Sequence, residues 1–168
     1  SSPSVFLSDP DGADAPYAPS PTVDGLIGPG EYAGAHKLTF PGYGGEVEVF
    51  IRQDAVTLYI AFDSPDTAPY ANYGGGTGPA FQVFLDTGND KAGTPQMDDY
   101  RLTVDKGGNV LEDRGDGTTW TTQWPLSGWT AAVYTATWGW QAEFAISFSK
   151  LGIISGTKIY LPLVMRNH

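Results

Sequence analysis

The stretch Val56-Thr57-Leu58-Tyr59-Ile60-Ala61-Phe62-Asp63 decides the fold class. It is rich in β-branched and aromatic residues, which favour strands. Leu58, Ile60 and Phe62 recur at every second position, the period of a strand that buries one face. The three residues before it, Gln53-Asp54-Ala55, are enough for a hairpin loop. The sequence therefore predicts a half-buried strand here, in a hairpin with the run before it.

Short runs of the same kind recur along the rest of the chain, separated by glycine, proline, asparagine and aspartate. They cover residues 36–40, 47–53, 80–87, 100–105, 110–111, 130–138, 140–148 and 158–165. The last run contains Pro162, which has no N–H to donate and therefore favours an edge position. About nine strands at this spacing predict an all-β fold, a two-sheet antiparallel β-sandwich that is jelly-roll-like.

The first 24 residues differ from the rest of the chain. One apolar cluster, Val5-Phe6-Leu7, precedes four prolines, at positions 10, 16, 19 and 21. Proline fixes φ and biases the preceding residue towards extended backbone. We predict an extended N-terminal arm over residues 1–24 and a single β-sandwich domain over residues 25–168. Val5, Phe6 and Leu7 are candidate assembly residues, because an extended strand can pair with an open sheet edge of a neighbouring molecule.

The chain of 168 residues carries a formal net charge of −10. That charge repels phosphate backbones and anionic lipids, so we expect neither a nucleic-acid partner nor membrane insertion. No apolar run approaches the roughly 20 residues that span a bilayer. Cysteine is absent and no G-x-S-x-G motif occurs, which excludes thiol chemistry and the familiar serine elbow. We expect no enzymatic activity and assign no catalytic residue.

An acidic loop over residues 86–99 is the first candidate metal site. Its oxygen-bearing side chains are Asp86, Asn89, Asp90, Asp98 and Asp99. Calcium takes about six to eight oxygen ligands, and carboxylates this close repel one another unless a cation lies between them. The alternative is a solvated acidic loop, since the spacing is not that of an EF-hand.

A second acidic group, formed by Asp9, Asp11 and Asp14 around Gly12, is the other candidate calcium site. Its opening is similar to that of many calcium loops. It lacks the downstream bidentate glutamate of the EF-hand, and aspartates of this kind also form turns and caps. Ca²⁺ is the only cofactor that the sequence predicts.

Three tryptophans, Trp120, Trp124 and Trp129, fall in a polar loop expected over residues 113–129. An exposed indole face stacks on sugar rings or anchors a protein interface. These three are therefore candidate ligand-binding residues, and packing against the core is the alternative. Trp138 and Trp140 lie within strand runs, where we expect core and cross-strand packing.

The order of the signals resembles that of a known family. They are Val23-Asp24-Gly25, Gly30-Glu31-Tyr32, the strand over 56–62, Phe81–Asp86, Asp99–Leu102, Gly139–Phe148 and Leu151-Gly152. Over residues 23 to about 165 the sequence resembles the family 9 carbohydrate-binding modules and the wider DOMON-like β-sandwiches. The resemblance implies a two-sheet sandwich, with non-catalytic sugar binding in some members, haem in others and structural calcium in several. Tyr32 stands where the family often has tryptophan.

Two functions stay open at this point. The first is calcium-supported glycan binding at the cell surface by a secreted protein. The second is a structural subunit of an extracellular filament or surface assembly, in which the N-terminal strand is donated to a neighbouring copy and builds a homo-polymer. The opening Ser1-Ser2-Pro3 fits a chain trimmed by signal peptidase, and the segment over 159–164 resembles the tails of some exported bacterial proteins. We therefore expect an extracellular location.

Overall fold

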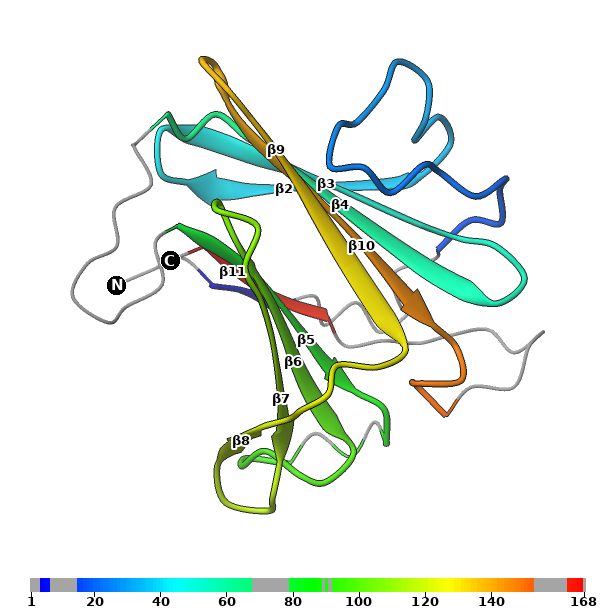
Figure 1. Ribbon diagram of the computed structural model, residues 1–168, viewed down its shortest axis with the longest axis vertical. Helices are drawn as coiled ribbons and strands as arrows, with labels where there is room; N and C mark the ends of the chain where they lie inside the picture. Colours follow the sequence, from blue (N-terminus) through cyan, green and yellow to red (C-terminus); the bar gives the residue numbers. More distant parts are fainter. Residues whose placement is uncertain are drawn as a thin grey trace.

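The computed structural model describes residues 4–6, 15–67, 79–88, 90, 92–152 and 163–167. Their strands form two antiparallel sheets that pack face to face, and Figure 1 shows the two layers. No helix occurs within the described ranges, so none there is long and apolar enough to cross a membrane. The predicted all-β sandwich is confirmed.

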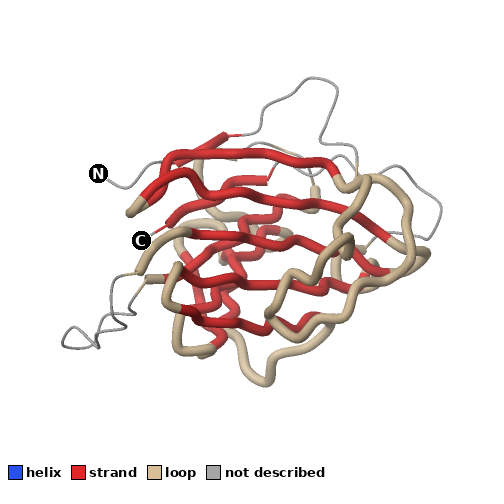
Figure 2. The backbone as a smooth tube through the Cα atoms, turned by 90° about the horizontal axis from the view of Figure 1, so that it is seen from above, coloured by secondary structure: helices blue, strands red, loops and turns tan. Residues whose placement is uncertain are grey.

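The two sheets contain six and five strands. In spatial order the six-stranded sheet consists of β1 (Ser4–Phe6), β11 (Leu163–Asn167), β5 (Ala80–Asp86), β6 (Asp99–Asp105), β7 (Val110–Gly115) and β8 (Trp120–Thr122). The five-stranded sheet consists of β2 (His36–Gly42), β3 (Gly45–Gln53), β4 (Thr57–Ser64), β10 (Gly139–Ser147) and β9 (Trp129–Ala136). Viewed from above, the described chain is strand and connecting loop (Figure 2).

The core lies between the inner faces of the two sheets. Leu58, Ile60 and Phe62 are fully buried there, so the predicted face of β4 is confirmed. The Phe62 ring stacks on Phe81 of the other sheet, with 4.3 Å between ring centroids, and Phe81 stacks on Trp140 at 4.4 Å. Burying each large apolar side chain contributes about 1.5–3 kcal/mol, so this aromatic stack is a main link between the layers.

Two expectations about individual strands are wrong. β11 is an interior strand that pairs with β1 on one side and β5 on the other, although Pro162 predicted an edge. The paired residues begin at Leu163, so no proline lies within the ladder. β8 forms inside the expected loop over 113–129, because its three residues continue the antiparallel ladder of β7.

The expected N-terminal arm is partly placed. β1 is three residues long and extends the edge of its own sheet, with Val5 opposite Met165. Leu7 lies outside the described residues. From residue 15 the chain runs against the five-stranded sheet, where Tyr17 forms an isolated bridge with Gln53.

A buried carboxylate fixes the next part of the N-terminal segment to the outer face of the five-stranded sheet. Glu143, fully buried on β10, accepts hydrogen bonds from the backbone N–H groups of Asp24 at 3.1 Å and Gly25 at 2.8 Å. It also accepts one from the Tyr32 hydroxyl at 3.0 Å. Burial raises the pKa of Glu143, and burial together with the nearby Glu143 raises the pKa of Tyr32. Glu143 therefore fixes Asp24 and Gly25, one on each side of the predicted boundary, to the same sheet.

Candidate functional site

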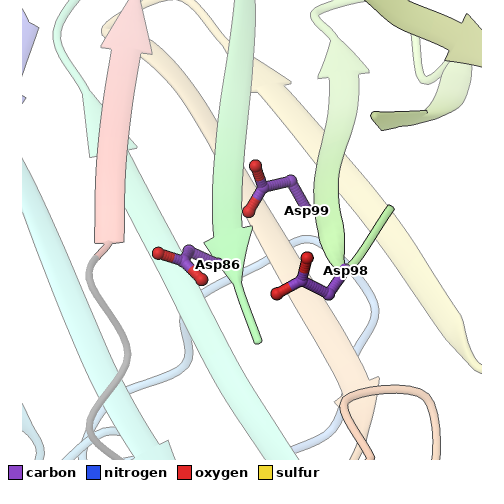
Figure 3. A group of neighbouring side chains, drawn as sticks. All are labelled: Asp86, Asp98 and Asp99. Carbon is purple, nitrogen blue, oxygen red and sulfur yellow. The ribbon is translucent and has the colours of Figure 1, made fainter. Parts of the chain in front are cut away.

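Three carboxylates of the acidic loop meet where β5 ends and β6 begins. Asp86 and Asp99 are opposite each other in the β5–β6 ladder, and Asp98 precedes Asp99. One oxygen of each lies within 4.8 Å of the others, and Figure 3 shows Asp86 at the end of β5 with Asp98 and Asp99 at the start of β6. The loop closes because the Thr87 hydroxyl donates to the Asp98 carbonyl at 2.7 Å and the Gln96 N–H donates to Asp99 Oδ2 at 2.7 Å.

The charges in this group repel one another. Like charges directly opposite in an antiparallel pair are destabilising. The pKa of Asp99 is raised, first by burial and then by the negative charges of Asp86, Asp98 and Asp90. Carboxylate oxygens are the ligands that Ca²⁺ prefers, and an oxygen that already accepts one hydrogen bond keeps a second lone pair. The donor set therefore fits a hard divalent cation.

The other predicted metal ligands are placed differently. Asp90 is exposed, and its backbone N–H donates to Asp86 Oδ1 at 3.3 Å. Asn89 and the second acidic group, Asp9, Asp11 and Asp14, lie outside the described residues. The structure thus brings together Asp86, Asp98 and Asp99.

The three candidate tryptophans lie in separate environments. Trp129 is buried, stacks on Phe144 and donates its indole N–H to Glu112 at 2.6 Å, so neither face is open to a ligand. Trp120 is half-buried against Phe84, with 5.8 Å between ring centroids. Trp124 is 71% exposed. Of the three, Trp124 has the ring surface that stacking on a sugar requires.

A second exposed aromatic group was not expected. Trp138 is 47% exposed, so its predicted place in the core is wrong. It lies in the two-residue turn between β9 and β10, because Ala136 pairs directly with Gly139. Tyr43, in the turn between β2 and β3, is 73% exposed. The sequence signal was the glycine that follows each ring, Gly139 after Trp138 and Gly44 after Tyr43.

The two turns that carry these rings pack against one proline at the end of β4. A Cβ atom added at Gly45 would lie 2.9 Å from Pro65 Cγ, and one added at Gly139 would lie 2.9 Å from Pro65 Cα. Both positions therefore need glycine, and both turns are held against Pro65 from either side. We call Tyr43, Pro65 and Trp138 the aromatic end of the sandwich.

Polar side chains lie beside the aromatic end on the outer face of the five-stranded sheet. Glu48, Asp63 and Gln141 occupy one cross-strand row on β3, β4 and β10. The Gln141 side-chain oxygen accepts a hydrogen bond from the Ile27 N–H at 3.0 Å, which directs its amide nitrogen towards Asp63. Burial raises the pKa of Asp63, and the charge of Glu48 raises it further.

Comparison with known proteins bears on the fold. No protein-family model matches the sequence, and no match was found among curated proteins. A family 9 carbohydrate-binding module from Caldicellulosiruptor kristjanssonii, solved with cellotriose, matches with a TM-score of 0.64 at 15% identity, over 91% of this chain and 82% of that one. The same kind of module from that organism, solved with glucose, gives 0.61 at 15% identity, over 91% and 83%. This chain has the fold of the family 9 modules. The predicted resemblance is thereby confirmed at the level of fold.

Proposed function

We propose that this chain is a non-catalytic glycan-binding domain whose sugar contacts are made at the aromatic end. The observation that carries the proposal is that two exposed rings, Tyr43 and Trp138, are held by turns that pack on one proline. Aromatic faces offer a large apolar surface at low entropic cost, which suits the C–H face of a pyranose ring. The shared fold supports it, because the two similar structures are modules in complex with cellotriose and glucose.

The row formed by Glu48, Asp63 and Gln141 adds directional hydrogen bonds, which ring stacking alone does not provide. Sugar hydroxyls need acceptors and donors of fixed direction, and carboxylates and amides provide them. Asp63 lies two residues before Pro65, and its register neighbours are Glu48 and Gln141. Gln141 is buried and orients Asp63, so the half-buried carboxylates of Asp63 and Glu48 are the groups of this row that remain for sugar hydroxyls.

Alanine variants test the position of the site. Trp138→Ala and Tyr43→Ala are each expected to weaken binding of cellotriose about tenfold or more in isothermal titration calorimetry, which is about 1.4 kcal/mol. Tyr17→Ala is the matched control, because Tyr17 is also 73% exposed but bridges Gln53 at the opposite end of β3. Equal losses for Tyr17→Ala, or a loss confined to Trp124→Ala, would move the site away from the aromatic end.

Calcium at the β5–β6 loop is the second part of the proposal. Asp86, Asp98 and Asp99 would hold the ion, and its charge would remove the repulsion between them. The bound ion would stiffen the loop rather than touch the sugar. The three aspartates lie at the end of β5, whereas the aromatic end lies where β4 ends, at the opposite end of the sandwich. An extracellular location is part of the same proposal, which takes the ligand to be a glycan at the cell surface.

The assembly function is supported by one observation. β1 is a short terminal strand on a sheet edge, and a strand of this kind can exchange onto a neighbouring copy. Deleting residues 1–12 should then leave a folded monomer, while the intact chain forms fibres that electron microscopy can show with and without a chelator. Continued polymerisation of the shortened chain would contradict donation of this strand.

A further inference from the structure

The four edges of the two sheets are protected to different degrees. β1 and β8 are only three residues long, and β2 carries Lys37 and Pro41. Natural sheets use short strands, charges and proline in this way to prevent pairing between molecules. β9 has none of these devices, because its eight residues, WTAAVYTA, include no charge, no proline and no glycine. It is the long unprotected edge among the described strands.

The hydrogen-bond register identifies which groups of β9 are open. Ser147 N–H donates to the Gly128 carbonyl at 2.8 Å, which makes this a hydrogen-bonded pair next to Ile146 and Trp129. Hydrogen-bonded and non-bonded pairs alternate along an antiparallel ladder, so the even-numbered residues of β9 bond to β10. The odd-numbered residues, Trp129, Ala131, Val133 and Thr135, turn their backbone groups outward. No described residue pairs with those groups.

Neighbouring segments support β9 from its two faces. On the outer face Gly25 lies against the Val133 backbone, at a point where a Cβ atom would come within 2.4 Å. On the inner face the Thr135 hydroxyl donates to the Lys106 carbonyl at 3.5 Å. The first contact brings Gly25 over the Val133 backbone N, C and O atoms from the outer face, and the second uses the Thr135 side chain. Neither contact is a hydrogen bond to the outward N–H and C=O groups.

We propose that two copies of this chain pair through β9, antiparallel and about a two-fold axis, to join their five-stranded sheets into one. The net charge of −10 makes most of the surface repulsive towards another copy, and β9 offers a segment without charge. In a register centred on Val133, each exposed Tyr134 faces the small side chain of Ala132 from the second copy. A large side chain thus packs against a small one on the outer face. The backbone groups of the odd-numbered residues exchange hydrogen bonds between the two copies.

The pairing has a consequence that rests on the proposed function. Trp138 lies in the turn that follows β9, so the two aromatic ends of an antiparallel dimer point in opposite directions. Such a dimer would bridge two glycan chains rather than bind one chain twice.

Amide exchange and sedimentation test the pairing without any glycan. Residue-resolved hydrogen exchange by NMR should show the even-numbered amides of β9 protected at every protein concentration. The odd-numbered amides should gain protection as the concentration rises, in step with the dimer fraction from sedimentation velocity. Tyr134→Lys should weaken the dimer at least tenfold while the amide spectrum stays folded. Thr39→Lys on β2 is the matched control and should leave the dimer unchanged.

Three results would overturn the proposal. The first is a protein that stays monomeric at millimolar concentration with unprotected odd-numbered amides. The second is a dimer in which those amides exchange freely, because another surface would then make the contact. The third is equal weakening by Tyr134→Lys and Thr39→Lys. Each result is independent of sugar binding, so failure here leaves the glycan proposal standing.

Discussion

Replacing Glu143 with alanine should destabilise the protein by leaving buried donors without an acceptor. The Gly25 N–H and the Tyr32 hydroxyl are both buried and both donate to this carboxylate, whereas the Asp24 N–H is only partly buried. Each orphaned buried donor costs about 1–3 kcal/mol. Removing the carboxylate also removes its own burial penalty, so we expect a net loss of about 2–3 kcal/mol in the free energy of unfolding.

Glu143→Gln is the matched variant, because it keeps the shape and one acceptor oxygen. Its oxygen can serve the two backbone donors, and its amide can donate to the Tyr32 hydroxyl, so the expected loss is about 1 kcal/mol. Both losses are measurable by urea unfolding followed by tryptophan fluorescence. An alanine variant within about 0.5 kcal/mol of the wild type would refute the reasoning, since that is the range of ordinary surface substitutions.

The same pair of proteins gives a pH dependence with a definite sign. The pKa of Glu143 in the folded protein is raised above its unfolded value by burial. A carboxyl group whose pKa is higher in the folded state than in the unfolded state contributes stability that is fully present below the unfolded pKa. This contribution is lost as pH rises through the folded pKa. The stability of the wild type relative to Glu143→Gln should therefore increase as pH falls through that window. A constant difference from neutral pH down to the ordinary glutamate pKa would contradict the shift.

Two further predictions concern the calcium loop and one glycine. Calcium at about 100 times its dissociation constant should stabilise the wild type by about 2.7 kcal/mol in thermal unfolding, reversibly with EDTA. Asp98→Asn should abolish that response and Glu46→Gln, which changes an exposed carboxylate on β3 of the other sheet, should keep it. Gly25→Ala should cost about 2 kcal/mol or more, because φ is +93° and the new Cβ would meet the β9 backbone. Gly34→Ala, at φ +76° with open space around it, should cost about 1 kcal/mol; equal losses would show that the contact is unimportant.

The strand faces could be predicted because their signal is local. Leu58, Ile60 and Phe62 follow a period of two, and the pleat alone places them on one side. Asp86 and Asp99 also followed from local structure, since consecutive antiparallel strands return the chain to the same sheet end. In both cases the residues that meet are joined by a short piece of chain.

The remaining features depend on contacts between distant parts of the chain. The sequence around Trp138 predicts a continuous strand, whereas the pairing of Ala136 with Gly139 makes Trp138 a turn residue. Trp129 packs in the core, where Glu112, 17 residues away, accepts its indole N–H. The clamp of Glu143 on Gly25 joins residues 118 positions apart. Periodicity carries no information about such pairs, which are fixed by the topology of the two sheets.

Calorimetric titration of the wild-type chain with cellotriose tests the central claim most directly. The account predicts saturable binding with one site per chain, a negative heat-capacity change from the buried aromatic surface, and a large loss in the double variant Tyr43→Ala with Trp138→Ala. The absence of heat with cellotriose, glucose and a wider panel of saccharides, from a chain shown to be folded and calcium-loaded, would contradict it.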